Sequence, residues 1–153
     1  MIEFEIEKLN LDDFEKCNNI WSLEANKDFT ENIYNELKSG NRITFVCKNS
    51  ENGEFLGEVS VVFEDEEIYT IKNVRIYLSH LTVKDTYRNQ GIGTNLCNYV
   101  FEFCKNLGYK EISLAVTLDN FGAIKLYHKL GFNEILAVNK DEHGEYVVLL
   151  KKF

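Results

Sequence analysis

A short glycine-bearing segment is the part of this sequence best suited to bind an anion. It lies between an alternating apolar run and a long helical pattern, and it reads Arg88-Asn89-Gln90-Gly91-Ile92-Gly93-Thr94. Backbone N–H groups at the start of a helix have no intrahelical acceptor and carry the positive end of the helix dipole. A diphosphate is a natural occupant of such a turn, and glycine lets its oxygens approach the amides. This segment is therefore a candidate anion site.

Two familiar phosphate loops do not fit this segment. A P-loop requires Gly-Lys followed by Ser or Thr, whereas Thr94 follows Gly93 directly. A dinucleotide-binding fingerprint requires a third glycine at the position where this chain has Leu96. By itself, the pattern R-x-x-G-x-G also describes an ordinary loop that enters a helix. A second motif is needed to distinguish a phosphate-binding loop from an ordinary one.

That second motif begins about one helix and one strand later. It has the pattern N-x-x-A-x-x-x-Y-x-x-x-G-F, with its fixed positions at Asn120, Ala123, Tyr127, Gly131 and Phe132. The first segment matches the pattern Q/R-x-x-G-x-G/A with Arg88, Gly91 and Gly93. Together the two segments resemble motifs A and B of the GNAT superfamily of N-acetyltransferases. The close resemblance covers residues 80 to 133, and the order of the expected elements extends it over the chain.

The resemblance implies an activity and a cosubstrate. Members of this superfamily transfer an acetyl group from acetyl-CoA to a primary amine, by direct attack of the amine on the thioester. By this correspondence the main chain of Leu81, Thr82 and Val83 contacts the pantetheine arm and the thioester carbonyl. The amides from Arg88 or Asn89 through Thr94 cradle the pyrophosphate. Asn120 contacts the cofactor arm, and Tyr127 lies near the sulfur as the general acid. Small amines, amino acids, antibiotics and protein N-termini are all acetylated within the superfamily, so the resemblance does not identify the acceptor.

Several of these residues also fit plain structural roles. Tyr127 shares a helical face with apolar residues, as core tyrosines do. Asn120 fits the N-cap of its own helix, which is compatible with a cofactor contact. The side chain of Arg88 fits a solvated surface position as well as a phosphate contact. The rival function is a non-catalytic module that binds an acyl-CoA through the same loop and transfers nothing.

The general base is the part of the chemistry that the sequence leaves open. Lysine-like amines have a pKa of about 10.4, so the site must remove a proton before the nitrogen can attack. Some members of the superfamily carry Glu or His on the strand before the loop. Strand alternation places His80 on the face opposite Leu81, unless a bulge shifts the register. Glu58, His80 and a water chain remain the candidates.

The elements that must position these residues follow from apolar periodicity. Strands are expected over residues 2–6, 42–47, 55–63, 74–83, 112–116, 132–138 and 146–150. Helices are expected over residues 11–21 with Asn10 as N-cap, from Thr30 as N-cap to Gly40, over 92–107, and over 120–130. A hydrophobic staple between Phe29 and Tyr34 would open the second helix. The order β-α-α-β-β-β-α-β-α-β-β, with one β-α-β crossover, predicts a mixed α/β (α+β-like) fold. The resemblance implies the GNAT fold, with a mostly antiparallel central sheet and helices on both faces.

Composition limits the other functions. The 153 residues fit a single domain, residues 1–153, and the net charge of −8 disfavours nucleic acid and favours a cationic amine. No apolar run is long enough for a membrane span, and the first residues lack a signal-peptide pattern, so a cytoplasmic location is the expectation. The four cysteines form no C-x-x-C pair, and no metal site is expected. Edge strands near the C-terminus could pair two subunits in a homodimer.

Overall fold

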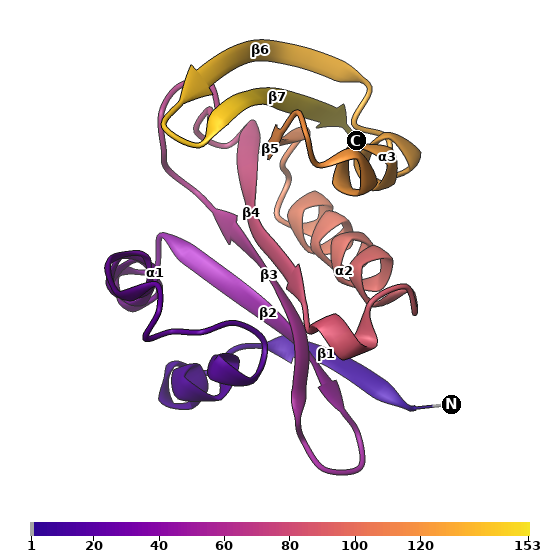
Figure 1. Cartoon of the computed structure of the whole chain (residues 1–153). Helices are drawn as coiled ribbons and strands as arrows, with labels where there is room; N and C mark the ends of the chain where they lie inside the picture. The colour runs from indigo at the N-terminus through magenta and orange to yellow at the C-terminus, as the bar shows by residue number, and fades with distance from the viewer. Residues whose placement is uncertain (1) are drawn as a thin grey trace. The chain divides into compact units, whose positions relative to one another are not determined.

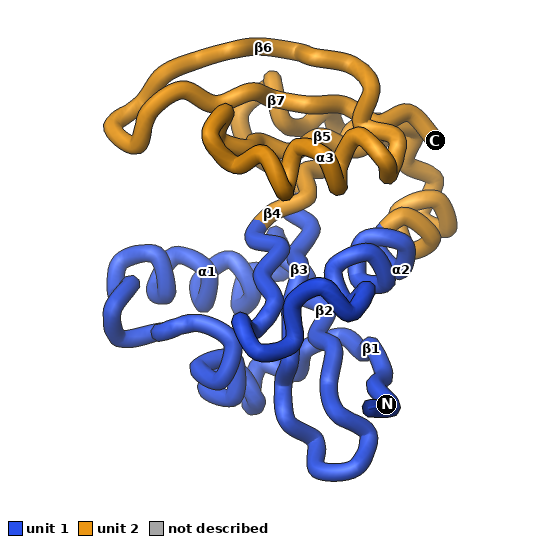
Figure 2. The backbone as a smooth tube through the Cα atoms, turned by 45° about the vertical axis from the view of Figure 1, so that its right-hand side comes forward, with its two compact units in different colours: residues 1–62, 80–100 blue, residues 63–79, 101–153 orange. Residues whose placement is uncertain are grey.

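The structure, a computed structural model, describes residues 2–153. It contains two compact units, which Figure 2 shows in different colours. The first unit comprises residues 1–62 and 80–100, and the second comprises residues 63–79 and 101–153. Strand β4 and helix α2 each contribute residues to both units.

The elements follow the order that the sequence predicts (Figure 1). They are β1 (Phe4–Lys8), the 3₁₀ helix η1 (Leu11–Asn19), α1 (Lys27–Ser39), β2 (Arg42–Asn49), β3 (Phe55–Val62), β4 (Arg75–Val83), the 3₁₀ turn η2 (Asp85–Tyr87), α2 (Ile92–Asn106), β5 (Glu111–Thr117), α3 (Phe121–Lys129), β6 (Glu134–Asp141) and β7 (Gly144–Lys152). The strands form a seven-stranded sheet in the order β1-β2-β3-β4-β5-β7-β6.

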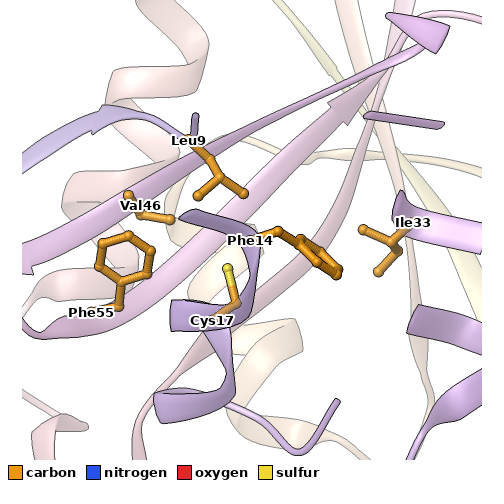
Figure 3. Packing of buried hydrophobic residues seen from close by; sticks show 6 residues of the cluster. All are labelled: Leu9, Phe14, Cys17, Ile33, Val46 and Phe55. Carbon is orange, nitrogen blue, oxygen red and sulfur yellow. The ribbon is translucent and has the colours of Figure 1, made fainter. Parts of the chain in front are cut away.

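In the first unit, helices cover both faces of the sheet. β1, β2 and β3 pair antiparallel, with Val46 opposite Glu58 and Cys47 opposite Gly57. On the face that carries Val46, η1 and α1 bury an apolar cluster, shown in Figure 3 and formed by Leu9, Phe14, Cys17, Ile33, Val46 and Phe55. On the opposite face the first turns of α2 approach so closely that a Cβ at Gly57 would lie 3.1 Å from Ile92 Cγ2. A side chain larger than hydrogen at Gly57 would therefore push α2 away from the sheet.

The parallel pairing of the described strands belongs to the second unit. β4 and β5 pair parallel from Arg75↔Glu111 to Tyr77↔Ser113, and α2 connects the two strands. β7 then pairs antiparallel with β5 and with β6. Because only one pairing is parallel among those described, and helices lie on both faces of the first unit, the predicted fold class is confirmed.

Two local predictions about the first unit are wrong. The segment from Leu11 is a 3₁₀ helix and not an α-helix. The prediction failed because nine residues of apolar spacing do not distinguish three residues per turn from 3.6. Helix α1 begins at Lys27, since the amide of Thr30 already donates to Asn26 O at 2.8 Å. The Thr30 hydroxyl donates to Leu23 O and therefore does not cap the helix.

The predicted staple between Phe29 and Tyr34 is also absent. The ring of Phe29 packs against Trp21 and His80, whereas the ring of Tyr34 packs against Phe14. The earlier helix start explains the difference, because it places Phe29 inside the first turn of α1 and not before it. Asn10 does accept from the amide of Asp12, and Gly40 ends α1 with a φ of 86°, as predicted.

Candidate functional site

The segment before α2 presents a run of backbone amides, the amide arc, defined as the N–H groups of residues 89–94. Helix α2 begins at Ile92, and its first helical bond runs from Asn95 N to Gly91 O at 3.0 Å. Just before the arc, the amides of Tyr87 and Arg88 donate to carbonyls of their own turn. Within residues 2–153, no backbone carbonyl accepts a hydrogen bond from the arc. These donors, at the positive end of α2, can therefore bind an anion.

Two left-handed residues shape the arc. Asn89 has a φ of 62° and Gly91 a φ of 84°, a region that asparagine tolerates and glycine enters freely. A Cβ at Gly91 would meet only Asn95 Nδ2, at 3.9 Å, so packing does not require glycine there. The requirement comes from the backbone conformation and from access to the exposed amides.

The side chain of Arg88 is occupied by its own loop. Its guanidinium forms an ion pair with Asp85 at 2.9 Å, and its Nε donates to Val83 O at 3.3 Å. The ion pair lies at the surface, where such pairs contribute little. A phosphate contact by this side chain remains a prediction.

Leu81, Thr82 and Val83 form the last, half-buried part of β4, directly before the arc. The carbonyl of Thr82 lies 3.2 Å from the position that a Cβ at Gly57 would occupy. Gly57 therefore brings β3 close both to this end of β4 and to the start of α2. Among the described residues, the parallel ladder between β4 and β5 ends at Tyr77, well before these three positions.

The second motif forms a helix and its caps in the second unit. The side chain of Asn120 accepts from the amide of Ala123 at 3.2 Å and so caps α3, as predicted. The ring of Tyr127 is 8% exposed and contacts Phe132, with ring centroids 5.7 Å apart. Gly131 ends the segment with a φ of 100°. Asn120 therefore caps α3, and Tyr127 packs against Phe132. The cofactor contact of Asn120 and the acid role of Tyr127 remain predictions.

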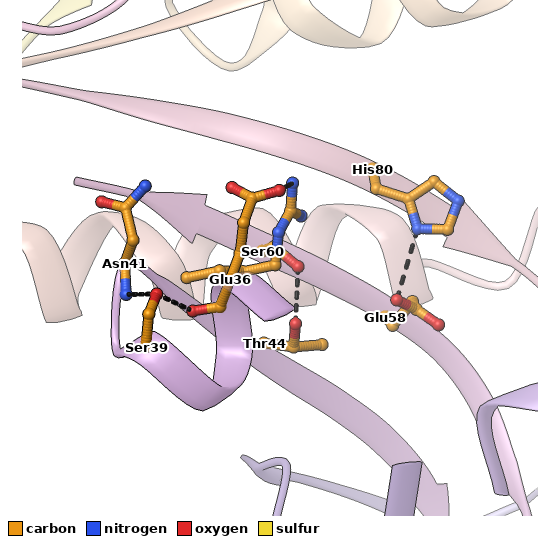
Figure 4. Close-up of polar contacts among 8 residues, drawn as sticks. Glu36, Ser39, Asn41, Thr44, Glu58, Ser60 and His80 are labelled. Atoms are coloured by element: carbon orange, nitrogen blue, oxygen red, sulfur yellow. Dashed lines mark hydrogen bonds and ion pairs between the residues drawn. The ribbon is translucent and has the colours of Figure 1, made fainter. Parts of the chain in front are cut away.

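The structure brings together Glu58 and His80, which the sequence treats as alternatives. His80 Nδ1 lies 3.3 Å from Glu58 Oε2, and Figure 4 shows the imidazole facing the carboxylate from the neighbouring strand. The other carboxylate oxygen, Oε1, accepts a hydrogen bond from the indole Nε1 of Trp21. The side chain of Glu58 is 3% exposed and that of His80 is 18% exposed, so the imidazole is the member of the pair that solvent can reach.

Sequence reasoning missed the two aromatic neighbours of this pair. Trp21 and Phe29 follow η1 and open α1, and their rings lie 4.8 and 5.1 Å from that of His80. Apolar periodicity assigned Trp21 to a helical face and Phe29 to a staple. The only sequence signal for their actual place is that they are aromatic residues near the junction of two expected helices.

No group of three His, Cys, Asp or Glu side chains within residues 2–153 is arranged to hold a metal ion. In the same part of the chain, no helix has the length and apolar character needed to cross a membrane.

Comparisons with known proteins agree with this geometry. The profile of the Acetyltransferase (GNAT) family matches residues 5–132. An uncharacterised N-acetyltransferase of Methanocaldococcus jannaschii is 30% identical over 137 residues, which cover 84% of this chain and 59% of that protein. N-alpha-acetyltransferase 30 of Schizosaccharomyces pombe is 33% identical over 82 residues, which cover 54% of this chain and 53% of that protein. This chain thus spans between half and two thirds of the length of these two relatives.

A solved structure shows the same fold. A GNAT family acetyltransferase from Elizabethkingia anophelis, with acetyl-CoA bound, superposes with a TM-score of 0.75. The match covers 98% of each chain at 18% sequence identity.

Proposed function

Because this chain belongs to the GNAT acetyltransferase family, we propose that it transfers the acetyl group of acetyl-CoA to a primary amine. The observation that carries the proposal is the amide arc, a set of donors at the start of α2 without backbone acceptors among the described residues. A diphosphate supplies the oxygens and the negative charge that such a site prefers. Acetyl-CoA carries a diphosphate, and the Elizabethkingia anophelis relative was solved with that cofactor.

The remaining cofactor contacts come from both motifs. The main chain of Leu81, Thr82 and Val83 binds the pantetheine arm, in keeping with the end of the β4–β5 ladder at Tyr77. Asn120 adds a side-chain contact to the cofactor arm.

In the transfer step, the uncharged amine attacks the thioester carbon directly. A C–N bond forms, negative charge develops on the carbonyl oxygen, and the C–S bond then breaks with its electron pair on sulfur. Tyr127 protonates the leaving sulfur as the general acid, so that the free thiol departs. The nitrogen loses one proton to water, and the sulfur gains one proton from Tyr127. Tyr127 then recovers its own proton from water.

The acceptor is a cationic amine in solution. The net charge of −8 favours the approach of a positively charged molecule. The Schizosaccharomyces pombe relative is named for acetylation at an α-amino group, which makes a peptide N-terminus one acceptor to test.

A homodimer through a C-terminal edge strand also belongs to the proposal. β6 is the edge of the sheet, and its side chains Ile135 and Val138 are exposed at 66% and 56%. An unpaired edge with exposed apolar residues can pair with a second copy. Sedimentation equilibrium tests this, and a monomer at high concentration would contradict it.

The test of the activity is thiol release from acetyl-CoA in the presence of a panel of amines. The panel contains a polyamine, an aminoglycoside, free amino acids and a short peptide with a free N-terminus. We expect amine-dependent release of the thiol together with a product that is heavier by one acetyl group. Tight binding of acetyl-CoA without turnover on any amine would support the non-catalytic acyl-CoA-binding module instead.

A further inference from the structure

We propose that His80 is the group that takes the proton from the acceptor amine, and that Glu58 and Trp21 position its imidazole for this task. The inference rests on the proposed acetyl transfer, because it assigns a residue to the step that makes the amine nucleophilic. It concerns four side chains of the first unit, Cys17, Trp21, Glu58 and His80, which come from three separate parts of the chain.

The contact with Glu58 determines which ring nitrogen of His80 can act. A carboxylate only accepts hydrogen bonds, so the contact between Glu58 Oε2 and His80 Nδ1 places the ring proton on Nδ1. The lone pair of the neutral imidazole then lies on Nε2, at the opposite side of the ring. A base needs such a lone pair within reach of the substrate, and the partial exposure of His80 provides access.

Glu58 itself is held by two further donors. Trp21 Nε1 donates to its Oε1, and the Cys17 thiol lies against the same carboxylate. Burial, followed by the charge and the hydrogen bond of Glu58, raises the pKa of the Cys17 thiol. Cys17 therefore stays protonated and donates. With donors on both oxygens and almost no exposure, the carboxylate has little freedom to turn away from His80.

The imidazole is also fixed by aromatic packing. The rings of Trp21 and Phe29 contact that of His80 edge to face, at 4.8 and 5.1 Å between centroids, and contact each other at 5.7 Å. Within residues 2–153, the contacts described above bring two titratable groups to the cluster, Glu58 from β3 and Cys17 from η1, and α1 contributes the uncharged Phe29. The Glu58 carboxylate lies on the Nδ1 side of the ring.

The backbone of His80 is an outlier of the kind that accompanies functional sites. The φ of His80 is 57°, although the residue has a Cβ and lies inside strand β4. Such a conformation is strained and persists when the surroundings determine it. This left-handed conformation interrupts the side-chain alternation of β4 at His80, whose side chain contacts Glu58. The hydrogen bond and the ring contacts of His80 offset the strain.

The proton balance of the step is simple. The acceptor arrives as an ammonium ion and gives one proton to Nε2, which produces a neutral amine and an imidazolium next to the Glu58 carboxylate. The amine then attacks the thioester as described above. The imidazolium releases its proton to water before the next turnover, so that the reaction yields one amide, one thiol and one proton.

The first test measures the tautomer of His80 and does not depend on knowing the acceptor. Long-range ¹H–¹⁵N spectra of the labelled protein at pH 8 distinguish a proton on Nδ1 from a proton on Nε2. We expect the Nδ1–H form in the wild type and its loss in Glu58→Gln, with no change in the control His143→Asn. His143 is an exposed histidine in the turn between β6 and β7. An Nε2–H form in the wild type would overturn the proposal.

The second test uses the pH dependence of kcat/KM with the best amine of the panel. A base must be unprotonated to accept the proton, so the wild type should show an acidic limb that depends on His80. His80→Asn should lose that limb and lower kcat by about a hundredfold or more. His80→Gly accepts the left-handed backbone, and added imidazole should restore part of its activity. Glu58→Gln should lower kcat by roughly tenfold with little change in KM, because its one carbonyl oxygen cannot replace both carboxylate oxygens, which accept from Trp21 and His80.

Binding of acetyl-CoA, measured by calorimetry, shows that each variant is folded. If the wild type acetylates an amine while His80→Asn retains both its rate and its acidic limb, His80 is not the base and the proposed function stands. If the wild type binds acetyl-CoA but acetylates no amine, the proposed function fails and the role of His80 fails with it.

Discussion

The amide arc and the His80–Glu58 pair are both in the first unit, and they place polar groups in opposite ways. The arc uses consecutive backbone groups that have no backbone acceptor among the described residues, and it needs no side chain to function. The pair uses side chains from β3 and β4 together with Trp21, and its carboxylate is almost fully buried. A site built from local backbone can be recognised from glycine spacing, whereas a site built from distant side chains depends on how the strands and helices pack.

The same difference predicts how each region responds to substitution. The arc should tolerate most changes of its own side chains and fail only when a new group obstructs the amides. The pair should fail when any one of its side chains is removed. Four variants test this contrast and the proposed role of Tyr127, from the largest expected effect to the smallest.

Gly91→Glu should abolish the binding of acetyl-CoA. The new side chain forces a φ of 84° on a residue with a Cβ and places a carboxylate among the amides that receive the diphosphate. Calorimetry measures the affinity directly. Gly53→Glu is the matched control, because Gly53 has a φ of 74° and open space around it in the β2–β3 turn. Equal losses in both variants would show that strain, and not the arc, explains the effect.

Tyr127→Phe should lower kcat by about a hundredfold while leaving the affinity for acetyl-CoA nearly unchanged. The phenol acts on the leaving sulfur, and the ring, which packs against Phe132, is retained. Steady-state kinetics and calorimetry together separate the two quantities. An unchanged kcat would make Tyr127 a core aromatic residue, in line with its burial.

Gly57→Ala should weaken acetyl-CoA binding severalfold and destabilise the fold by about 1–3 kcal/mol. The added methyl group would lie 3.1 Å from Ile92 Cγ2 and 3.2 Å from Thr82 O, so α2 or the end of β4 must move. Thermal unfolding and calorimetry measure the two effects. Full affinity together with lowered stability would mean that the arc does not depend on this packing.

Arg88→Ala should have the smallest effect, less than about fivefold on the affinity for acetyl-CoA, since an exposed ion pair contributes about 0–1 kcal/mol. The side chain already pairs with Asp85 and Val83 O. A large loss of affinity, steeper at low salt, would instead show that the guanidinium contacts the diphosphate.

Much of the fold was predictable because its signals are local. The strands of residues 42–49 and 55–62, the turn between them, helix α2 and the glycine at the end of α1 all follow from apolar spacing and turn residues. The start of α1 was not predictable, since Thr30 is a residue type typical of an N-cap but its hydroxyl donates to Leu23 O. Spacing alone also gave no means of separating a 3₁₀ helix from an α-helix over nine residues.

The site divides in the same way. Gly91 and the start of α2 were predicted at the correct positions, because a helix start and a glycine-bearing turn are features of a single segment. Glu58 and His80 were recognised only as separate candidates. Their pairing depends on a left-handed residue inside β4 and on the indole of Trp21, neither of which alternation or motif spacing can predict.

The most direct measurement is an amide titration of the ¹⁵N-labelled protein with acetyl-CoA. The largest shifts should occur at Asn89 to Thr94, to lower field as these N–H groups bond the diphosphate, while the amide of Gly53 stays unchanged. Saturable binding of acetyl-CoA that leaves the resonances of the amide arc unmoved would contradict the assignment of the cofactor site.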